Sequence, residues 1–424
     1  MFYFCKKMKM PMKTLLVGIL GLLVAGFASP AFAQKDEARS LHYGAEPLCF
    51  GSVEEWEAVH RPVIYRFFEQ EVYGKMPTRQ IPMRFEVLSE HTALNGLARM
   101  KQVAIHLQGL KEPMLLLIYL PRAAKKPVPL FLALNFQGNH QISADERIII
   151  SKNAPTGEAL KNDPPRAAAA SRWPLELIVG RGYGVATLAS YDVDPDFDDG
   201  FKNGVHALFN RAGSESPAGS TWGTIGAWAW GLSRAMDYLE TDPDVNAKQV
   251  ALLGHSRLGK TALWAGAADP RFAMVISNAS GCSGAALAIR GVKESVAAIN
   301  KRFPHWFCDN YNRYSNNESA MRVDQQGLIA LIAPRPVYVA SASKDQYADG
   351  LGEFLAARRA SPVYELYGLK GLQQDSLPAV DMPIRGGHVG YHIRTGYHDL
   401  TPYDWTQYLD FADFHFRTES TAKK

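Results

Sequence analysis

The sequence predicts an α/β fold, in which a mostly parallel central sheet is covered by helices on both faces. Two observations lead to this class. Short, nearly continuous apolar segments recur along the chain, as expected of strands buried on both faces, and segments with helical spacing separate them. The composition, 47% apolar and 21% charged over 424 residues, is that of a large globular protein. A chain of this length buries a sizeable core without disulfide bonds.

The predicted strands follow one another through most of the chain. The third of them, an unbroken apolar segment, is closed by Pro121, which cannot donate a hydrogen bond to a neighbouring strand. Because helices separate the later strands, we expect parallel pairing with right-handed crossovers. The segments are Met83–Leu88, Lys101–Leu107, Met114–Leu120, Val128–Leu134, Tyr183–Leu188, Gln249–Leu253, Ala273–Ser277 and Pro336–Ala340.

Four segments have helical spacing, and the polar stretch 140–172 is expected to be a long loop. The helices are Val53–Tyr73, Trp222–Tyr238, Lys260–Ala268 and Thr406–Phe416. Neither an internal repeat nor a linker rich in Pro, Gly and Ser divides the chain. We therefore expect one catalytic domain over 34–424, with an N-terminal extension at about 34–80.

The first 33 residues have the pattern of a signal peptide. Basic residues precede the apolar segment Leu15–Phe27, and Ala31-Phe32-Ala33 fits the cleavage rule that requires small residues. The apolar segment is short for a membrane span, although an uncleaved anchor is the alternative. A mature chain from Gln34 is expected to be secreted or periplasmic, without a membrane partner after cleavage.

Charge and cysteine content narrow the possible partners. The net charge of +4 is small, so no nucleic-acid partner is expected. After removal of Cys5 three cysteines remain, Cys49, Cys282 and Cys308. The sequence allows either a Cys282–Cys308 disulfide bond or three buried thiols. CxxC and HExxH motifs are absent, so no metal or other cofactor is expected, and we expect a monomer.

The strongest motif is Gly254-His255-Ser256-Arg257-Leu258-Gly259, between a predicted strand and a predicted helix. A strained turn there exposes the serine hydroxyl at the carboxyl edge of the sheet, as in α/β-hydrolases. The match to G-x-S-x-G is imperfect, because Leu258 occupies the second glycine position. A serine that only caps the following helix is the structural alternative. We predict Ser256 to be a nucleophile.

A nucleophilic serine needs a histidine base and an acid that orients it, and α/β-hydrolases place them in the order Ser, acid, His. His398 lies in a glycine-containing loop before the last helix, although His388 and His392 are competitors by position. His415 falls within a helix among aromatic residues, where packing explains it. Asp345 and Asp349 both follow the strand at 336–340, and each qualifies as the acid.

Several further motifs in order resemble bacterial glucuronoyl esterases of carbohydrate esterase family 15, from about residue 45 to 416. The resemblance implies an α/β-hydrolase without a metal that cleaves the ester between 4-O-methyl-glucuronic acid of glucuronoxylan and a lignin alcohol. The motifs are Asn135–His140, Gly254–Lys260, Asn278–Ala286, Phe303–Phe307, Ala333–Pro336 and Tyr391–Leu400.

The resemblance also implies roles for particular residues. Ser256 would be the nucleophile and His398 the base, and the Arg257 side chain would stabilise the oxyanion beside a backbone N–H. Lys260 would bind sugar hydroxyls, and Glu294 corresponds to a sugar-binding position. A surface ion pair is the alternative for Arg257, although its place next to the nucleophile favours the functional role. Glu294 could equally be an ordinary exposed glutamate.

The chain departs from the family pattern at two positions. Many members carry the triad glutamate where this chain has Ala279, so the acid must come from after the later strand: Asp345, with Asp349 in reserve. Tyr347 replaces a common tryptophan near the sugar and keeps an aromatic face. Among the other aromatic residues, Trp306 and Phe307 are expected in the core, while Trp173 and Trp222 belong to the core or to a polysaccharide groove.

Two alternative functions remain open. An acetyl-xylan esterase would use the same serine chemistry on a smaller acyl group, but Arg257 and Lys260 favour an acidic or hydroxyl-rich substrate. A catalytically inactive carbohydrate-binding protein would explain Ala279. The acetyl-xylan esterase differs from the family activity in the ester that is cleaved. The inactive binding protein would be favoured if Asp345 lay beyond hydrogen-bond reach of His398.

Overall fold

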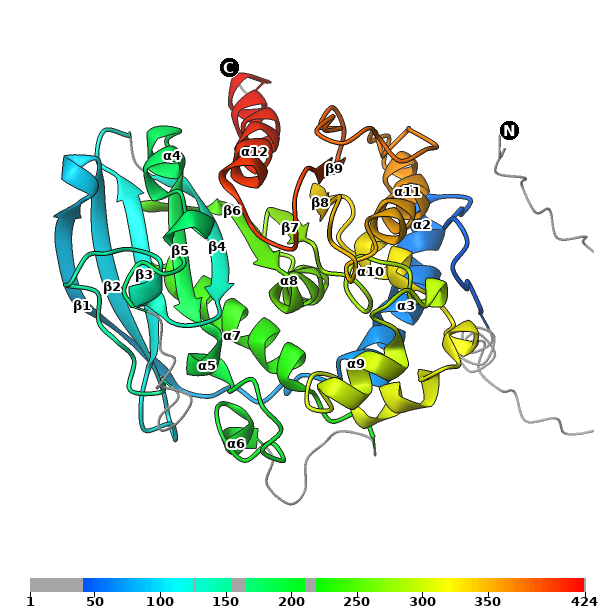
Figure 1. Cartoon of the computed structure of the whole chain (residues 1–424), viewed down its shortest axis with the longest axis horizontal. Helices are drawn as coiled ribbons and strands as arrows, with labels where there is room; N and C mark the ends of the chain where they lie inside the picture. The colour runs from blue at the N-terminus through cyan, green and yellow to red at the C-terminus, as the bar shows by residue number, and fades with distance from the viewer. Residues whose placement is uncertain (1–40, 125–126, 155–164, 210–218, 423–424) are drawn as a thin grey trace, which may run out of the picture.

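A computed structural model describes residues 41–124, 127–154, 165–209 and 219–422, so the predicted signal peptide lies outside the described residues. The strands of the described chain form one nine-stranded sheet in the order β1-β2-β3-β5-β4-β6-β7-β8-β9 (Figure 1). The strands are β1 Met83–Ala93, β2 Ala98–Leu107, β3 Met114–Pro121, β4 Val128–Asn135, β5 Gly184–Ala189, β6 Val245–His255, β7 Met274–Asn278, β8 Val337–Ala342 and β9 Val389–Arg394.

The sheet is parallel from β5 through β4 to β9, and β1, β2 and β3 are antiparallel to their neighbours. The predicted α/β class with a mostly parallel sheet is confirmed. All eight predicted strands are present, but β9 was not predicted. Its segment has no continuous apolar run, because the polar residues His392 and Arg394 interrupt it. Both residues are nevertheless buried in the protein. Buried polar residues of this kind hide a strand from a hydropathy pattern.

Helices cover both faces of the sheet (Figure 1). The predicted helix at 53–73 is a continuous helical segment of α and π turns over 53–72. Several helices were not predicted, among them the long α11. The α-helices are α2 Val53–Glu55, α3 Arg61–Phe67, α4 Leu175–Gly180, α5 Ser190–Val193, α6 His206–Phe209, α7 Thr224–Leu239, α8 Arg257–Ala268, α9 Val296–Arg302, α10 Gln325–Ala330, α11 Gly350–Leu366 and α12 Pro402–Ala422.

Two hydrophobic cores lie on opposite faces of the sheet. Along β4, Leu130 and Leu132 belong to the core that includes α7, α8 and α11, whereas Phe131 and Ala133 belong to the core that includes α4 and α12. Successive side chains of a strand point to opposite faces, so a strand that is apolar throughout contributes to both cores. This pattern explains the continuous apolar segments in the sequence.

The N-terminal helical segment packs onto the helices beside the sheet. Ile64 and Phe68 are buried and lie against Gly327 of α10, and the Tyr73 hydroxyl donates to the Ser283 carbonyl at 2.7 Å. Cys282 and Cys308 are buried free thiols, which excludes the bridge between them. Cys49 is exposed, so the alternative of three buried thiols is wrong as well. Among the described residues, no helix has the length and apolar character needed to cross a membrane.

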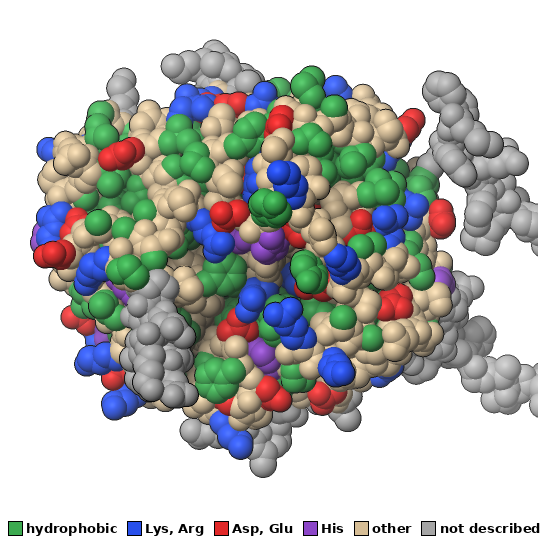
Figure 2. All heavy atoms as spheres, in the orientation of Figure 1, with side chains coloured by type: hydrophobic (Ala, Val, Ile, Leu, Met, Phe, Trp, Pro, Cys, Tyr) green, Lys and Arg blue, Asp and Glu red, His purple; other side chains and the backbone are tan. Residues whose placement is uncertain are grey.

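Strands β6, β7, β8 and β9 run in the same direction, so their carboxyl ends meet at one edge of the sheet. The space-filling view shows histidine side chains gathered near the middle of one face, with lysine and arginine side chains around them (Figure 2). The predicted site residues follow the ends of these strands.

Candidate active site

Ser256 occupies a strained turn between β6 and α8, with φ 58° and ψ −129°. Glycines on either side make this turn possible. A Cβ atom at Gly254 would lie 1.9 Å from the Leu258 carbonyl oxygen, and one at Gly259 would lie 2.9 Å from Ser280. The second glycine is therefore needed one position later than in the usual motif, where α8 crosses the loop after β7. Leucine is accommodated at position 258 because the close contact with the loop after β7 falls at Gly259 instead.

His398 and Asp345 reach the serine from two other loops. The His398 Nε2 lies 2.9 Å from Ser256 Oγ, and its Nδ1 lies 2.5 Å from Asp345 Oδ2. Asp345 follows β8, and His398 lies in the loop between β9 and α12, which is drawn in red in Figure 1 and descends toward α8. The tertiary fold thus brings together Ser256, His398 and Asp345, the three residues predicted to form a catalytic triad.

Asp345 is held as an ionised acceptor. Burial raises the pKa of its carboxyl group, but the hydrogen bond and charge of His398 and the N–H groups of Tyr347 and Ala348 lower it more, so the pKa lies below its ordinary value. An ionised Asp345 accepts from His398 Nδ1–H, which leaves Nε2 as the acceptor for the serine hydroxyl. This is the tautomer that a base for Ser256 requires.

Backbone pairing aligns the two loops that carry Asp345 and His398. The Ser343 N–H donates to the Arg394 carbonyl at 2.8 Å, and the Lys344 N–H donates to the Gly396 carbonyl at 2.8 Å. The pairing continues the β8–β9 register beyond the strands. Because the register is fixed, Asp345 is the carboxylate opposite His398.

The other candidates for acid and base lie elsewhere. Asp349 forms an ion pair with Arg290, with Nε 2.6 Å from Oδ2. His392 is fully buried and bonded to Asp404, and His388 packs against His415. The imidazole of His415 is buried in α12 and its Nε2 contacts the Gly387 carbonyl, in agreement with the predicted packing role.

The Arg257 side chain lies between an acid and three aromatic rings. It forms an ion pair with Asp196, and its guanidinium carbon lies 4.8 Å from the ring centroid of Trp306. The rings of Phe136 and Phe303 complete the aromatic surroundings. The Asp196 carboxylate also accepts from Trp306 Nε1 at 2.7 Å and contacts His305 Nε2 at 3.0 Å.

Sequence analysis missed Asp196. It lies in the loop after α5, distant in sequence from Arg257, and an aspartate in a polar stretch carries no local signal. Burial raises the pKa of the Asp196 carboxyl group, but His305, Arg257 and Trp306 together lower it below its ordinary value. The ionised Asp196 therefore fixes the direction of the Arg257 guanidinium beside Ser256.

Lys260 is buried, and its ammonium group is bonded within the protein. It donates to the carbonyls of Ser280 and Cys282 at 2.5 and 2.7 Å and to Glu294 Oε2 at 3.0 Å. An ammonium group has three donors, so these bonds occupy all of them. These bonds hold Glu294 and the loop after β7, and the contact of Lys260 with sugar hydroxyls stays a prediction.

A pocket of about 190 Å³ opens over Ser256 and His398. Glu294, Lys260, Arg257 and the exposed ring of Tyr347 line it, so the structure brings the predicted binding residues to one cavity. Trp306 is buried in the core, as predicted, and it also lines this cavity. Trp222 is buried against His206 and does not line this cavity.

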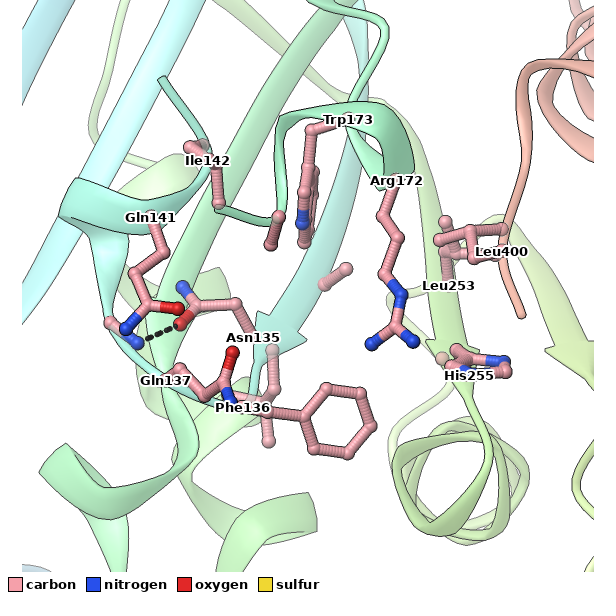
Figure 3. Close-up of a pocket in the computed structure, with 15 residues that line it drawn as sticks. Asn135, Phe136, Gln137, Gln141, Ile142, Arg172, Trp173, Leu253, His255 and Leu400 are labelled. Atoms are coloured by element: carbon pink, nitrogen blue, oxygen red, sulfur yellow. Dashed lines mark hydrogen bonds between the residues drawn. The ribbon is translucent and has the colours of Figure 1, made fainter. Parts of the chain in front are cut away.

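A second, narrower pocket lies beside the same turn. Figure 3 shows the Arg172 side chain extending toward the space between Phe136 and His255, with Trp173 beside it above Asn135. Its volume of about 30 Å³ leaves room for roughly one water molecule. Burial, followed by the charges of His398 and Arg172, lowers the pKa of His255 to about 3, so this imidazole is neutral. The larger pocket is the one with room for a substrate.

Ala279 follows β7, where the family resemblance leads one to expect an acid, and it supplies no carboxylate. A different buried acid, Glu353 of α11, lies behind this loop. Its carboxyl group accepts from the Gly281 N–H at 3.0 Å and from the Ser341 hydroxyl at 2.5 Å. Complete burial raises the pKa of Glu353 to about 8. Glu353 therefore links the loops after β7 and β8 in its protonated form.

Replacing Glu353 with glutamine should flatten the pH dependence of stability. The folded protein keeps the carboxyl proton up to about pH 8, whereas the unfolded chain loses it near the ordinary pKa of 4.5. Between these values the native state binds more protons, so the free energy of unfolding falls as pH rises. We expect the wild type to lose more stability than Glu353→Gln between about pH 5 and pH 8 in denaturant titrations.

Glu365→Gln on the exposed side of the same helix provides the control, because an exposed carboxyl group has little effect of this kind. A wild-type minus Glu353→Gln stability difference that is equal at both pH values would contradict the prediction.

Comparison with known proteins places these residues in a family. A family model for fungal glucuronyl esterases matches residues 195–368. The carbohydrate esterase MZ0003 from an unknown prokaryotic organism is 45% identical over 92% of this chain and 93% of its own length. The chain belongs to carbohydrate esterase family 15. It is a carboxylic ester hydrolase of the glucuronoyl esterase type.

Solved structures agree with this assignment. A promiscuous family 15 esterase from a marine bacterial metagenome has a TM-score of 0.81 and 42% identity, over 89% of this esterase and 98% of that chain. The glucuronoyl esterase from Solibacter usitatus has a TM-score of 0.80 and 43% identity, over 88% and 99% of the two chains. The predicted α/β-hydrolase fold and the stated resemblance are both confirmed.

Proposed function

We propose that this family 15 esterase hydrolyses the ester between 4-O-methyl-glucuronic acid of glucuronoxylan and a lignin alcohol, with Ser256 as nucleophile. The contact of His398 with both Ser256 Oγ and Asp345 carries the proposal. Relatives named 4-O-methyl-glucuronoyl methylesterase support the acyl group, including one from Wolfiporia cocos that is 30% identical over 49% of this chain and 53% of its own length.

The reaction follows from the geometry of the three side chains. Ser256 Oγ attacks the ester carbonyl carbon while its proton passes to His398 Nε2. The imidazolium then gives that proton to the alcohol oxygen as the ester C–O bond breaks, which leaves an acyl-enzyme on Ser256. Water, deprotonated by His398, attacks the acyl carbon. The imidazolium then returns the proton to Ser256 Oγ as the acyl C–O bond breaks and the uronic acid leaves. Asp345 stabilises the imidazolium and remains ionised throughout.

Two donors are available for the negative charge that develops on the carbonyl oxygen. The Arg257 N–H is the first of α8, where no partner exists within the helix. The Arg257 guanidinium is fixed beside it by Asp196. Donors that are oriented before the reaction stabilise the oxyanion without reorganisation. We therefore assign Arg257 to the oxyanion site.

The pocket over Ser256 supports a sugar acid as the acyl group. Glu294 offers carboxylate acceptors to hydroxyl groups, and Tyr347 offers an exposed aromatic ring to the apolar face of a sugar. Lys260 keeps Glu294 in position and partly neutralises it. An acetyl group would use none of these contacts, which favours the glucuronoyl ester over the acetyl-xylan alternative. The contact of Asp345 with His398 supports an active enzyme over a binding protein.

The substrate assignment is tested by comparing kcat/KM on benzyl or methyl glucuronate with kcat/KM on acetylated xylan. We expect the glucuronate esters to be preferred by about 10²-fold or more, because polar groups built for sugar hydroxyls stay unpaired with an acetyl ester. Tyr347→Ala and Glu294→Gln should reduce this preference. Turnover of the acetyl ester alone would overturn the assignment.

We also propose that residues 1–33 direct export and are removed, so that the mature chain begins at Gln34. The apolar segment and the small residues before Gln34 support this. Sequencing the amino terminus of protein recovered outside the cytoplasm tests it, and an intact Met1 would contradict it.

A further inference from the structure

We propose that Arg394 is the positioning residue for the His398 loop, held in place by Asp404, and that it sets the rate of the ester cleavage proposed above. Arg394 ends β9, and His398 lies four positions later in a loop that leads to α12. Nothing in the chemistry of Ser256, His398 and Asp345 uses Arg394 directly. Apart from its ion pair with Asp404, the Arg394 side chain contacts the backbone of the loop that carries His398.

The Arg394 guanidinium donates to backbone carbonyls on both sides of His398. Nη2 donates to the carbonyl of Tyr397 at 3.0 Å and to that of Asp399 at 2.7 Å, and Nη1 donates to that of Thr395 at 3.2 Å. The side chain is only 5% exposed. Three carbonyls of one short loop therefore point toward a single buried cation. Their hydrogen bonds to Arg394 hold the loop in this conformation.

Asp404 anchors the cation from the first turn of α12. Its Oδ2 accepts from Arg394 Nε at 2.8 Å and from the N–H of Thr401 at 2.8 Å, and Oδ1 contacts His392 Nε2 at 2.9 Å. The carboxylate thus bonds to the end of β9 and to the start of α12. Both ends of the His398 loop are tied to the same buried ion pair.

Gly396 provides an independent observation. Its φ is +129°, and a Cβ atom there would lie 2.7 Å from Arg394 Nη1. The loop therefore lies directly on the guanidinium, with no side chain between them. The Gly396 carbonyl also accepts from Lys344, next to Asp345, so the position of the loop on Arg394 is coupled to the acid as well.

Lysine cannot replace this arrangement. Arg394 makes four hydrogen bonds in a plane, whereas an ammonium group has three donors in a tetrahedral array. Loss of the planar contacts would free the loop and displace the imidazole from Ser256. A displacement of about 1 Å in a catalytic group costs on the order of 10²-fold in rate. Substrate binding depends on residues after β6, β7 and β8 and would change little.

The test compares Arg394→Lys with Arg335→Lys, both with benzyl glucuronate as substrate. Arg335 is a matched control because it also donates to three backbone carbonyls, those of Gly266, Asp269 and Phe272, but at the opposite end of the sheet. Both variants should lower Tm. Only Arg394→Lys should lower kcat, by about 10²-fold for the folded fraction, with KM within about 2-fold of wild type.

Equal kcat values for the two variants would overturn the positioning role. Should Arg394→Lys fail to fold, Gly396→Ala changes the same contact from the loop side, and it should likewise lower kcat with little change in KM. Wild-type kcat in Gly396→Ala would count against the proposal. His398→Gln, measured in parallel, separates the two hypotheses: a retained rate would refute the base assignment itself, whatever Arg394 does.

Discussion

Replacing Ser256 with alanine is expected to lower kcat on glucuronate esters by about 10⁴-fold or more, because the substitution removes the hydroxyl group that His398 contacts. The substitution removes one oxygen atom at the end of β6 and leaves the strained turn with a small side chain. Hydrolysis of benzyl glucuronate at substrate concentrations above KM measures the effect. The folded structure should be unchanged, with a Tm close to that of the wild type.

Binding of the sugar acid separates loss of chemistry from loss of the site. The Ser256→Ala variant should bind glucuronic acid with nearly wild-type affinity in a calorimetric titration, because Glu294, Arg257 and Tyr347 remain. Ser376→Ala, which removes an exposed hydroxyl group, is the control. A Ser256→Ala enzyme with more than about a tenth of the wild-type kcat would exclude the acyl-enzyme mechanism.

The second large effect is expected at Asp345. Asparagine has nearly the same shape, but its amide group can donate to His398 Nδ1 and so favours the tautomer with the proton on Nε2. That tautomer cannot accept the proton of Ser256, and the corresponding change in a serine triad costs about 10⁴-fold in kcat. We expect Asp345→Asn to show a loss of this order, with KM nearly unchanged.

Asp349→Asn is the matched comparison, four residues away in the same segment. Asp349 forms an ion pair with Arg290 and precedes α11, so its substitution should lower Tm slightly and leave kcat within a few-fold of wild type. The reverse result, with a near-wild-type rate for Asp345→Asn and a large loss for Asp349→Asn, would show that the acid has been assigned to the wrong carboxylate.

The Asp345→Asn and Asp349→Asn experiments are informative because position 279 carries no acid. The family resemblance implies a triad glutamate there, after β7, while this esterase has alanine with a positive φ of 46°. The acid must then come from the neighbouring strand, β8. Strands β7 and β8 are adjacent and parallel, so a carboxylate after either one ends at the same edge of the sheet.

The buried Glu353 is a separate feature of this region. It bonds to the loop after β7 and to Ser341 at the end of β8, and burial keeps it protonated. Within the described part of the chain its hydrogen bonds go to Ser280, Gly281 and Ser341, and none goes to His398. Its effect is therefore expected in the pH dependence of stability and not in the catalytic step.

The sequence by itself determined the features that depend on neighbours along the chain. Apolar segments separated by helices predicted the α/β fold, because a buried strand needs apolar side chains on both faces. The strand, turn and helix around Ser256 are also local, and they predicted the nucleophile and the adjacent Arg257. The motifs in order predicted the family, which the comparisons confirm.

Only the tertiary structure decided which distant groups meet. Asp345 and Asp349 have the same local pattern, and the β8–β9 register brings only the first to His398. Asp196 reaches Arg257 from a remote loop, and Lys260 turns inward to carbonyls that the sequence does not reveal. Strand β9 escaped prediction because His392 and Arg394 are polar, and their burial depends on Asp404. Hydrogen bonds between buried polar groups join residues far apart in sequence, and so they appear only once the chain has folded.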